Sequence, residues 1–399
     1  MQPNNNFKGR SRPGGSRGHQ NNRPNRNFRK TPRPLQASRF INKAIAREDE
    51  TPYEAKHSFA DFGFDKRVEG TLDHIGYYAP SPIQDMAIKP AMAGHDVIGL
   101  ANTGTGKTAA FALPTINKLL DEPKIASVLV LAPTRELAQQ IDEEFRRFSS
   151  GLRIFSAVVV GGANIMRQIQ QIKRGPHVII GTPGRLNDLI DRKVLRLSGV
   201  ETFILDEADR MCDMGFVNDI RRIEAELPKE HQTLCFSATM TMDVQKIVEK
   251  FMHDPVSISV VKSETNDHIE QDVIHTNDKA HKLETLVELL ADSKLDKVLV
   301  FGETKFGVQR LADALNRQGF PSEAIHGNKS QSQRERALRS FKSGQVRILV
   351  ATDVAARGLD IPNVSHVINF DAPTQYDDYI HRIGRTGRAG LAGTALTFV

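Results

Sequence analysis

The chain has 399 residues, more than one compact hydrophobic core usually supports, so the length predicts two domains and an appendage. Hydrophobic residues make up 39% and charged residues 26%, no apolar run reaches the length of a membrane span, and the N-terminus lacks the apolar core of a secretory signal, which argues against membrane and secreted classes. Cys212 and Cys235 are too few for a disulfide framework or a zinc site, and we expect both to pack as small hydrophobes in a reducing compartment.

The net charge of +6 belongs to the N-terminal tail. Residues 1–40 carry ten Lys or Arg and no acid, which leaves 44 basic against 48 acidic side chains in the remainder. Residues 1–34 are almost free of apolar side chains, so we expect them to be disordered. The tail either attracts phosphate backbones without sequence preference or serves solubility, and the sequence leaves both interpretations open. Any nucleic-acid binding by the body then requires a local groove.

Residues 35–47 form the next segment. Several apolar residues there are spaced to share one side of a short helix: Leu35, Phe40, Ile41, Ala44 and Ile45. Such a helix would dock on the body or on a partner. A fraying linker explains the same residues equally well. We assign residues 1–56 to the tail.

A glycine-rich loop at residues 101–108 follows an apolar run at 96–100 and precedes a helical pattern at 109–120. Strand, glycine-rich turn and helix form the arrangement that cradles phosphates, because backbone N–H groups and the helix N-terminus face the anion. Lys107 can then reach the terminal phosphates, and the Thr108 hydroxyl can hold Mg²⁺. The first position of the usual glycine pattern is occupied by Ala101. The loop predicts a nucleoside triphosphate and nothing finer.

Alternating apolar runs and helical patterns continue to about residue 258. Runs at 128–131, 157–160, 178–180, 202–205 and 234–236 are continuous rather than alternating, which is typical of strands buried on both faces of a parallel sheet. Helical connections between them predict a doubly wound α/β domain over residues 57–258. The pattern breaks up between about 253 and 269, and we assign residues 259–269 to a linker.

A second α/β series fills residues 270–399. Its apolar runs lie at 298–301, 324–325, 348–350, 367–368 and 394–399, and it lacks a Gly-Lys-Thr loop of its own. Two similar sheets with one phosphate loop predict a nucleotide held between domains. The chain stops within an expected strand, so we expect the natural protein to continue.

An acidic cluster follows the buried run at 202–205, at the position where α/β folds place ligands. Asp206 can hold Mg²⁺, and Glu207 is then free to polarise an attacking water. Acids at a helix start also stabilise the helix dipole. The upstream Gly-Lys-Thr loop favours the catalytic interpretation.

Together these motifs resemble the DEAD-box RNA helicases, over essentially all of residues 57–399. Phe59 lies seventeen residues before Gly76, as the aromatic upstream of the family's Q motif does. The further motifs follow in the family's order at residues 76–84, 101–108, 133–137, 161–162, 182–185, 206–209, 237–239, 300–304, 326–327, 331 with 334, 351–360 and 381–388. The resemblance implies two tandem RecA-like domains, and the family's loop also has Ala at its first position.

For the ATP site, the resemblance implies a set of roles. Gln84 hydrogen-bonds the adenine edge, which suits an amide, and Phe59 covers the adenine face unless it is a core aromatic. Asp360 meets the ribose, and Arg385 and Arg388 are arginine fingers that neutralise the transferring phosphoryl group. The loop residues that bind the phosphates are Thr103, Gly104, Thr105, Gly106, Lys107 and Thr108. Two pairs couple this site to RNA and to the second domain: Ser237 with Thr239, and His381 with Arg382.

For RNA, the resemblance implies contacts from both domains: Thr134, Arg135, Gly162, Thr182 and Arg185 in the first, and Thr304, Gly327, Gln331, Arg334 and Thr352 in the second. Small residues, hydroxyls and a few arginines suit phosphate and 2′-OH contact rather than the reading of base edges. Turn formation and helix capping explain several of them too. The implied activity is RNA-dependent ATP hydrolysis with local duplex unwinding or remodelling of RNA–protein complexes, in the cytoplasm, with ATP and Mg²⁺. A DNA helicase and a non-unwinding RNA clamp are the alternatives.

Overall fold

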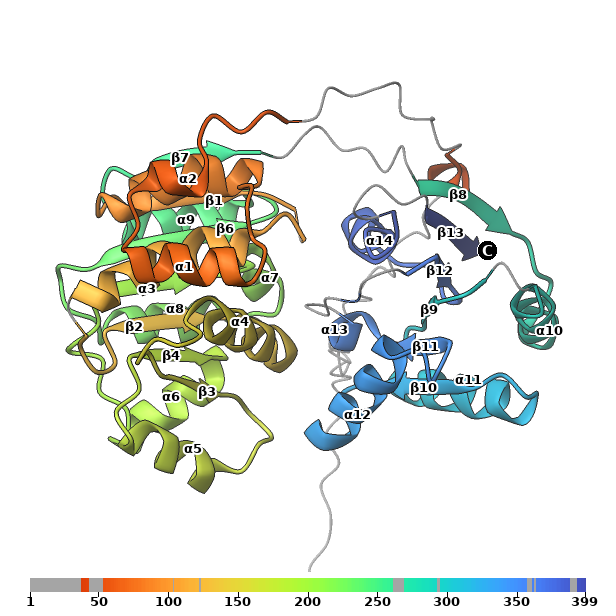
Figure 1. The fold of residues 1–399 in the computed structure, drawn as a ribbon. Helices are drawn as coiled ribbons and strands as arrows, with labels where there is room; N and C mark the ends of the chain where they lie inside the picture. The colour runs from red at the N-terminus through yellow and green to blue at the C-terminus, as the bar shows by residue number, and fades with distance from the viewer. Residues whose placement is uncertain are drawn as a thin grey trace, which may run out of the picture. The chain divides into compact units, whose positions relative to one another are not determined.

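The computed structural model describes residues 37–42, 53–102, 104–121, 123–260, 269–292, 295–356, 361, 364–387 and 393–399. The predicted disordered tail at 1–34 and most of the predicted linker lie outside these ranges. Two α/β domains follow one another along the chain (Figure 1). Within the described ranges, we find no helix with the length and apolar character needed to cross a bilayer.

The first domain is built on a seven-stranded sheet in the order β3-β4-β2-β5-β6-β1-β7, and every neighbouring pair is parallel. Strands β2 and β5 are buried at all four positions, which explains their unbroken apolar sequences. The strands are β1 (Val97–Leu100), β2 (Val128–Leu131), β3 (Ser156–Val159), β4 (Val178–Gly181), β5 (Thr202–Leu205), β6 (Gln232–Ser237) and β7 (Val256–Ser259).

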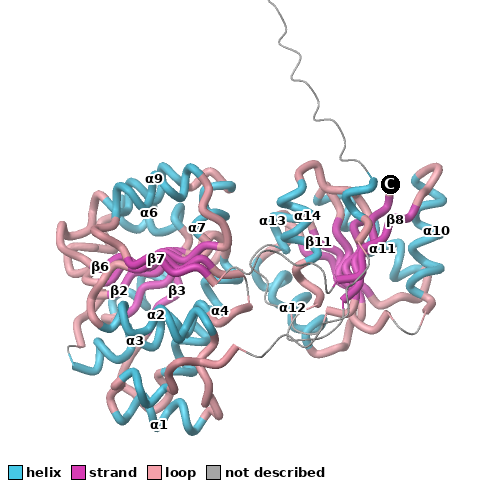
Figure 2. The backbone as a smooth tube through the Cα atoms, turned by 90° about the horizontal axis from the view of Figure 1, so that it is seen from above, coloured by secondary structure: helices cyan, strands magenta, loops and turns pink. Residues whose placement is uncertain are grey.

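Helices cover both faces of this sheet, as Figure 2 shows. Helices α1 to α4 pack on one face, where Phe111 and Phe145 lie in a large apolar cluster, and α6 to α9 pack on the other. A short 3-10 turn, η2 (Phe59–Phe62), precedes them. The helices are α1 (Lys66–His74), α2 (Pro82–Met92), α3 (Lys107–Asp121), α4 (Arg135–Phe148), α5 (Ile165–Lys173), α6 (Pro183–Asp191), α7 (Ala208–Asp213), α8 (Val217–Glu224) and α9 (Met242–Phe251).

The second domain has a six-stranded parallel sheet in the order β10-β11-β9-β12-β13-β8. Its strands are β8 (Ile269–Ile274), β9 (Val298–Phe301), β10 (Ser322–Ile325), β11 (Ile348–Ala351), β12 (His366–Asn369) and β13 (Gly393–Phe398). Its helices are α10 (Lys279–Leu290), α11 (Lys305–Arg317), α12 (Gln331–Lys342), α13 (Asp353–Ala356) and α14 (Tyr376–Ile383). Helices α10 and α11 cover one face, and α12 and α13 cover the other.

The predicted fold class of two tandem doubly wound parallel-sheet domains is confirmed. The strands predicted at 128–131, 202–205 and 298–301 have the predicted bounds. Strands β7 and β8 were not predicted, because each is a half-exposed edge strand with an alternating burial pattern that resembles a polar connection. The domain limits themselves stay predictions.

The predicted helix over 35–47 is only partly visible, since residues 37–42 alone are described. Ala37–Phe40 forms a single 3-10 turn, η1, and Asn42 then pairs with Gln271 of β8 in an antiparallel bridge. Within residues 37–42, helical structure therefore ends at Phe40.

Candidate active site

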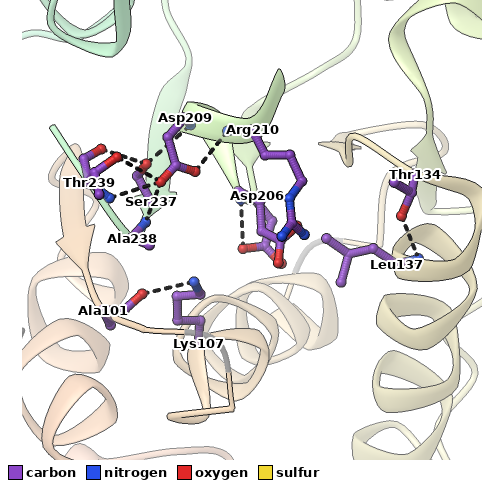
Figure 3. A network of polar contacts seen from close by, with 11 residues as sticks. Ala101, Lys107, Thr134, Leu137, Asp206, Asp209, Arg210, Ser237, Ala238 and Thr239 are labelled. Carbon is purple, nitrogen blue, oxygen red and sulfur yellow. Dashed lines mark hydrogen bonds and ion pairs between the residues drawn. The ribbon is translucent and has the colours of Figure 1, made fainter. Parts of the chain in front are cut away.

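The phosphate loop joins the end of β1 to the start of α3. Gly104 and Gly106 have φ values of +86° and +92°, a left-handed backbone that side chains with a Cβ rarely adopt. Lys107 is buried, and its Nζ donates to the Ala101 carbonyl at 2.9 Å (Figure 3). The loop thus holds its own lysine through one of the three N–H donors of the ammonium group. Thr103 lies outside the described residues.

Gln84 lies in the first turn of α2, where a capping box with Ser81 fixes the helix start. Its Nε2 donates to the Gly106 carbonyl at 2.9 Å and to the Tyr77 hydroxyl at 2.7 Å, and its Oε1 accepts from the Ser81 N–H at 3.0 Å. A Cβ on Gly106 would lie 2.2 Å from this Nε2. The predicted adenine-binding amide is therefore held directly against the phosphate loop.

Phe59 is buried, and its ring centroid lies 5.2 Å from that of Tyr77. The ring supports the tyrosine that binds Gln84, and it belongs to the apolar cluster of the first domain. Its contacts are those of the core aromatic that the sequence left as the alternative, while its predicted adenine contact stays a prediction.

Asp85, one residue after Gln84, holds the chain segment that leads to Phe59. Its carboxylate accepts from the Tyr53 hydroxyl at 2.5 Å and the Lys56 N–H at 2.8 Å, and lies 2.6 Å from His57 Nδ1. Burial raises the pKa of Asp85, but these bonds outweigh it and leave the pKa below its ordinary value. Sequence reasoning missed this residue because its partners are 28 to 32 positions away.

The acidic cluster begins where β5 ends. Asp206 is buried, and burial raises its pKa to about 6 although Lys107 opposes the shift. Glu207 has φ +52° and ψ +53°, a left-handed conformation that is rare for a residue with a Cβ and that often marks functional sites. The unusual backbone at Glu207 therefore marks this position as a candidate functional site.

Glu207 forms a buried ion pair with Arg210, one helical turn later. Burial raises the pKa of Glu207, but Arg210 and then Lys107 lower it, and the net result lies below its ordinary value. Glu207 is thus kept in its ionised form, which suits the base role predicted for it. Arg210 was not predicted, since one arginine in a helix start carries no signal in the sequence.

Asp209 connects the acidic cluster to the end of β6. Its Oδ2 accepts from the Ala238 and Thr239 N–H groups at 3.1 and 2.9 Å and from the Thr239 hydroxyl at 3.0 Å (Figure 3). The Ser237 hydroxyl in turn accepts from the Asp209 N–H at 3.1 Å. The predicted coupling pair Ser237 and Thr239 is therefore joined to the acids by a buried network. The sequence had predicted no role for Asp209, the last acid of the motif at residues 206–209.

The predicted RNA contacts of the first domain meet at the carboxyl ends of β2, β3 and β4. Thr134 caps α4 by accepting from the Leu137 N–H at 3.2 Å, and Thr182 precedes α6. Helix N-termini carry unpaired N–H groups that suit phosphate oxygens. Arg185 donates to Gln168 Oε1 at 3.0 Å, a partner that the sequence did not reveal.

Arg135 lies over the glycine pair at 161–162. A Cβ built on Gly162, where φ is +73°, would lie 2.0 Å from Arg135 Nη1. Because Gly162 has no side chain, it leaves room for the Arg135 guanidinium. The RNA contact predicted for Gly162 itself stays a prediction.

The predicted RNA contacts of the second domain also gather at strand ends. Thr304 caps α11 after β9 by accepting from the Gly307 N–H at 3.0 Å, and Thr352 follows β11. Gly327 follows β10, and Gln331 and Arg334 lie in the first turns of α12. Each domain thus presents its predicted contacts on one edge of its own sheet.

Arg382 organises the carboxyl edge of the second sheet. Its guanidinium bonds Asp353 through Nε at 2.5 Å and Nη2 at 2.7 Å, and donates to Asn369 Oδ1 at 3.2 Å and the Asp371 carbonyl at 2.6 Å. These bonds lie inside the second domain, so Arg382 joins α13 to the end of β12. Arg385 is buried, beside His381 and Arg382. Arg388 and Asp360 lie outside the described residues.

Family models match both domains. The DEAD/DEAH box helicase model matches residues 81–247, and the helicase conserved C-terminal domain model matches residues 281–390. The chain is 45% identical over 343 residues to the DEAD-box ATP-dependent RNA helicase CshA of Bacillus subtilis, covering 86% of this chain and 69% of the relative. It is 46% identical over 342 residues to the ATP-dependent RNA helicase CshA of Listeria monocytogenes, covering 86% of this chain and 66% of the relative. The chain thus spans about two thirds of the length of these relatives.

Solved structures resemble the fold at lower identity. The structure of Saccharomyces cerevisiae Dbp5 bound to RNA and ADP BeF3 is 33% identical with a TM-score of 0.76, and the similarity covers 86% of this chain and 89% of Dbp5. Mss116p bound to ssRNA and AMP-PNP is 30% identical with a TM-score of 0.79, covering 90% of this chain and 77% of Mss116p.

Proposed function

Because this chain belongs to the DEAD-box family of ATP-dependent RNA helicases, we propose that it hydrolyses ATP when it binds RNA and uses the cycle to unwind short duplexes or remodel RNA–protein complexes. The observation that carries this proposal is the buried network from Asp209 to Ser237 and Thr239. It ties the acids of the ATP site to a second strand end, which supports the proposal that RNA binding and ATP hydrolysis are coupled.

At the ATP site, Lys107 would exchange the Ala101 carbonyl for the terminal phosphates, and Gln84 would exchange the Gly106 carbonyl for the adenine edge. Glu207, kept ionised by Arg210, would polarise the attacking water. The donor set of a buried Asp206 carboxylate and the Thr108 hydroxyl fits Mg²⁺, which favours oxygen ligands and keeps several waters. When bound, Mg²⁺ would supply charge neutralisation on the phosphates.

The second domain would complete the site. Arg385 and Arg388 would stabilise the charge that develops on the transferring phosphoryl group, and Asp360 would meet the ribose. Arg382 would position the segment that carries Arg385 by holding α14 to Asp353 and Asn369. His381, one residue earlier on the same helix, would share this coupling role.

RNA would be held through its sugar-phosphate backbone. Helix N-termini, hydroxyls and Arg135, Arg185 and Arg334 suit phosphate and 2′-OH groups and carry no base-edge code, so binding would be largely independent of sequence. The basic tail would add contacts to RNA or protein. A cytoplasmic location stays a prediction.

The test is phosphate release measured with matched RNA, with DNA and without nucleic acid. We expect stimulation by RNA, and a fall of about 100- to 10,000-fold in Glu207→Gln, the range that general-base catalysis contributes. Glu201→Gln is the control, because Glu201 pairs with Lys124 at 2.6 Å on the surface. Stimulation by DNA alone would refute the choice of substrate, and an active Glu207→Gln would refute the role of Glu207. Unwinding on the same RNA, with residues 1–56 present or removed, separates a helicase from a clamp.

A further inference from the structure

A segment that precedes the first domain in sequence is packed on the second domain. Phe40, in the turn η1, is only 1% exposed, and its ring centroid lies 4.8 Å from that of Tyr379 at an interplanar angle of 55°. Ile269, Ile383 and Ala395 complete the apolar cluster around it. In Figure 1 this segment is the short red stretch beside β8. Phe40 therefore fills a pocket made by β8, β13 and α14.

The backbone of the same segment extends the sheet. The Asn42 N–H donates to the Gln271 carbonyl at 3.0 Å, and the Gln271 N–H donates to the Asn42 carbonyl at 2.8 Å. Strand β8 is the outer strand of its sheet, so its outer N–H and C=O groups need a partner. Addition of an extended segment to such an edge, with a side chain in an adjacent pocket, is a recurring mode of peptide recognition.

Gln271 links this docked backbone to helix α14. Its side chain is 4% exposed, and its Oε1 accepts from the Tyr379 hydroxyl at 3.0 Å. Tyr379 and Ile383, which contact Phe40, lie on the same helix as Arg382 and shortly before Arg385. The docked segment therefore packs against the helix that carries Arg382 and that precedes Arg385.

We propose that residues 37–42 are a docking segment, defined by the Phe40 anchor and the Asn42 pairing with β8, that completes the core of the second domain and positions α14. The occupant of this surface is this chain's own N-terminal region, a short peptide with an aromatic anchor in a 3-10 turn followed by one backbone pair with the edge strand. The next described residues, Tyr53 and Lys56, are bonded to Asp85 of the first domain. Residues 43–52 thus form a second covalent link between the domains, beside residues 261–268.

The neighbouring residue Ile41 provides a matched control. Its side chain is 52% exposed, so Ile41→Ala shortens an apolar residue of the same segment without touching the pocket. Amide hydrogen exchange of the full-length protein is the primary readout, because the Gln271 N–H is protected by the Asn42 carbonyl. We expect Phe40→Ala to accelerate exchange at Gln271 roughly tenfold or more, and Ile41→Ala to leave it within about twofold. Equal exchange in both variants overturns the proposal.

Two further variants keep the test decisive if Phe40→Ala folds poorly. Asn42→Pro keeps the aromatic anchor but removes the N–H that bonds the Gln271 carbonyl. The two backbones should then separate, and exchange at the Gln271 N–H should also accelerate. A chain that lacks residues 1–47 should show the same loss, and a peptide of residues 35–47 added to it should restore protection. Failure of both expectations refutes the docking segment.

The catalytic consequence rests on the proposed function. In RNA-stimulated ATP turnover, Phe40→Ala should lower kcat relative to Ile41→Ala while KM for ATP stays within about twofold, because the helix that precedes Arg385 loses its support. Unchanged kcat with accelerated exchange would confine the segment to a structural role and refute the positioning of α14. An inactive parent protein with intact exchange differences would instead refute the proposed function.

Discussion

The glycine pair at 161–162 offers the sharpest separation of local strain from function. Gly162 has φ +73°, and Ala in this conformation costs about 1 to 2 kcal/mol of folding free energy. The new Cβ would also lie 2.0 Å from Arg135 Nη1 and 2.5 Å from its Cζ. A flexible arginine end can move away at little cost to stability. It then no longer lies over the loop, where we expect it to meet a phosphate.

Gly151 provides the control for strain alone. Its φ is +80°, and a Cβ built there meets nothing within 4 Å. Gly162→Ala and Gly151→Ala should therefore lose similar unfolding free energy, about 1 to 2 kcal/mol each in urea titrations. Only Gly162→Ala should weaken RNA binding, because it displaces Arg135. A hydrogen bond to a charged group contributes about 1.5 to 3 kcal/mol, which corresponds to roughly ten- to hundred-fold in RNA affinity.

The assay is the RNA concentration that half-saturates ATP turnover, together with direct RNA binding by fluorescence anisotropy. Equal RNA affinity in the two variants, with equal loss of stability, would refute the idea that Gly162 serves Arg135. A much larger loss of stability in Gly162→Ala would show that Arg135 cannot move away.

Three further predictions concern buried polar groups. Burial raises the pKa of Asp206 to about 6, so the folded state favours the protonated acid and stability is lost as the pH rises through about 6. In urea unfolding with EDTA, the free energy of unfolding of Asp206→Asn should equal that of the parent near pH 4 and exceed it by about 3 kcal/mol at pH 7. A difference that does not depend on pH would contradict this. Asp209→Ala leaves the Ala238 and Thr239 N–H groups without their acceptor, so we expect a loss of about 2 to 4 kcal/mol in unfolding free energy, whereas a loss below about 1 kcal/mol would mean that water replaces the carboxylate. Arg382→Lys cannot reproduce the paired bonds to Asp353, so calorimetry should show a destabilised second domain, by about 3 kcal/mol, and an unchanged transition would refute the structural role of this arginine.

The strands that were predicted well are those buried on both faces. Residues 128–131 and 202–205 are apolar at every position, so their limits do not depend on knowing which face is inside. Strand β8 reads Ile-Glu-Gln-Asp-Val-Ile and buries Ile269 and Gln271 while Glu270 and Asp272 are exposed. A short charged stretch of this kind is an edge strand only once its neighbour is known.

Phe40 shows the same limit on the prediction of side-chain burial. Helical spacing assigned Phe40 and Ile41 to one apolar side, yet Phe40 is 1% exposed and Ile41 is 52% exposed. The 3-10 turn ends at Phe40, and Asn42 already pairs with β8, so the spacing of a longer helix does not apply to Ile41. The pattern was local, and the pairing partner lies more than 200 residues away.

The predicted catalytic residues carry a signal in the sequence, whereas the residues that hold them do not. Lys107, Asp206 and Glu207 lie in short motifs whose chemistry is visible in the sequence. The bonds from Asp209 to Thr239 depend on β5 and β6 being neighbours in the sheet, which the spacing of 30 residues does not reveal. Asp85 and Arg210 act through their partners, and a partner can be assigned only when the fold is known.

The internal bonds of the phosphate loop imply that ATP binding remodels the loop rather than filling a finished pocket. Lys107 is bonded to Ala101 and Gln84 to Gly106, so two of the groups expected to bind ATP are already paired with the loop. Each exchange replaces one protein bond by one bond to nucleotide, so the net gain from either group is small. Both exchanges require both parts of the nucleotide, because Lys107 is expected to meet the phosphates and Gln84 the adenine. A nucleotide that lacks either part should therefore leave one of the two bonds in place, and the loop then favours ATP by responding fully only to both ends of the molecule.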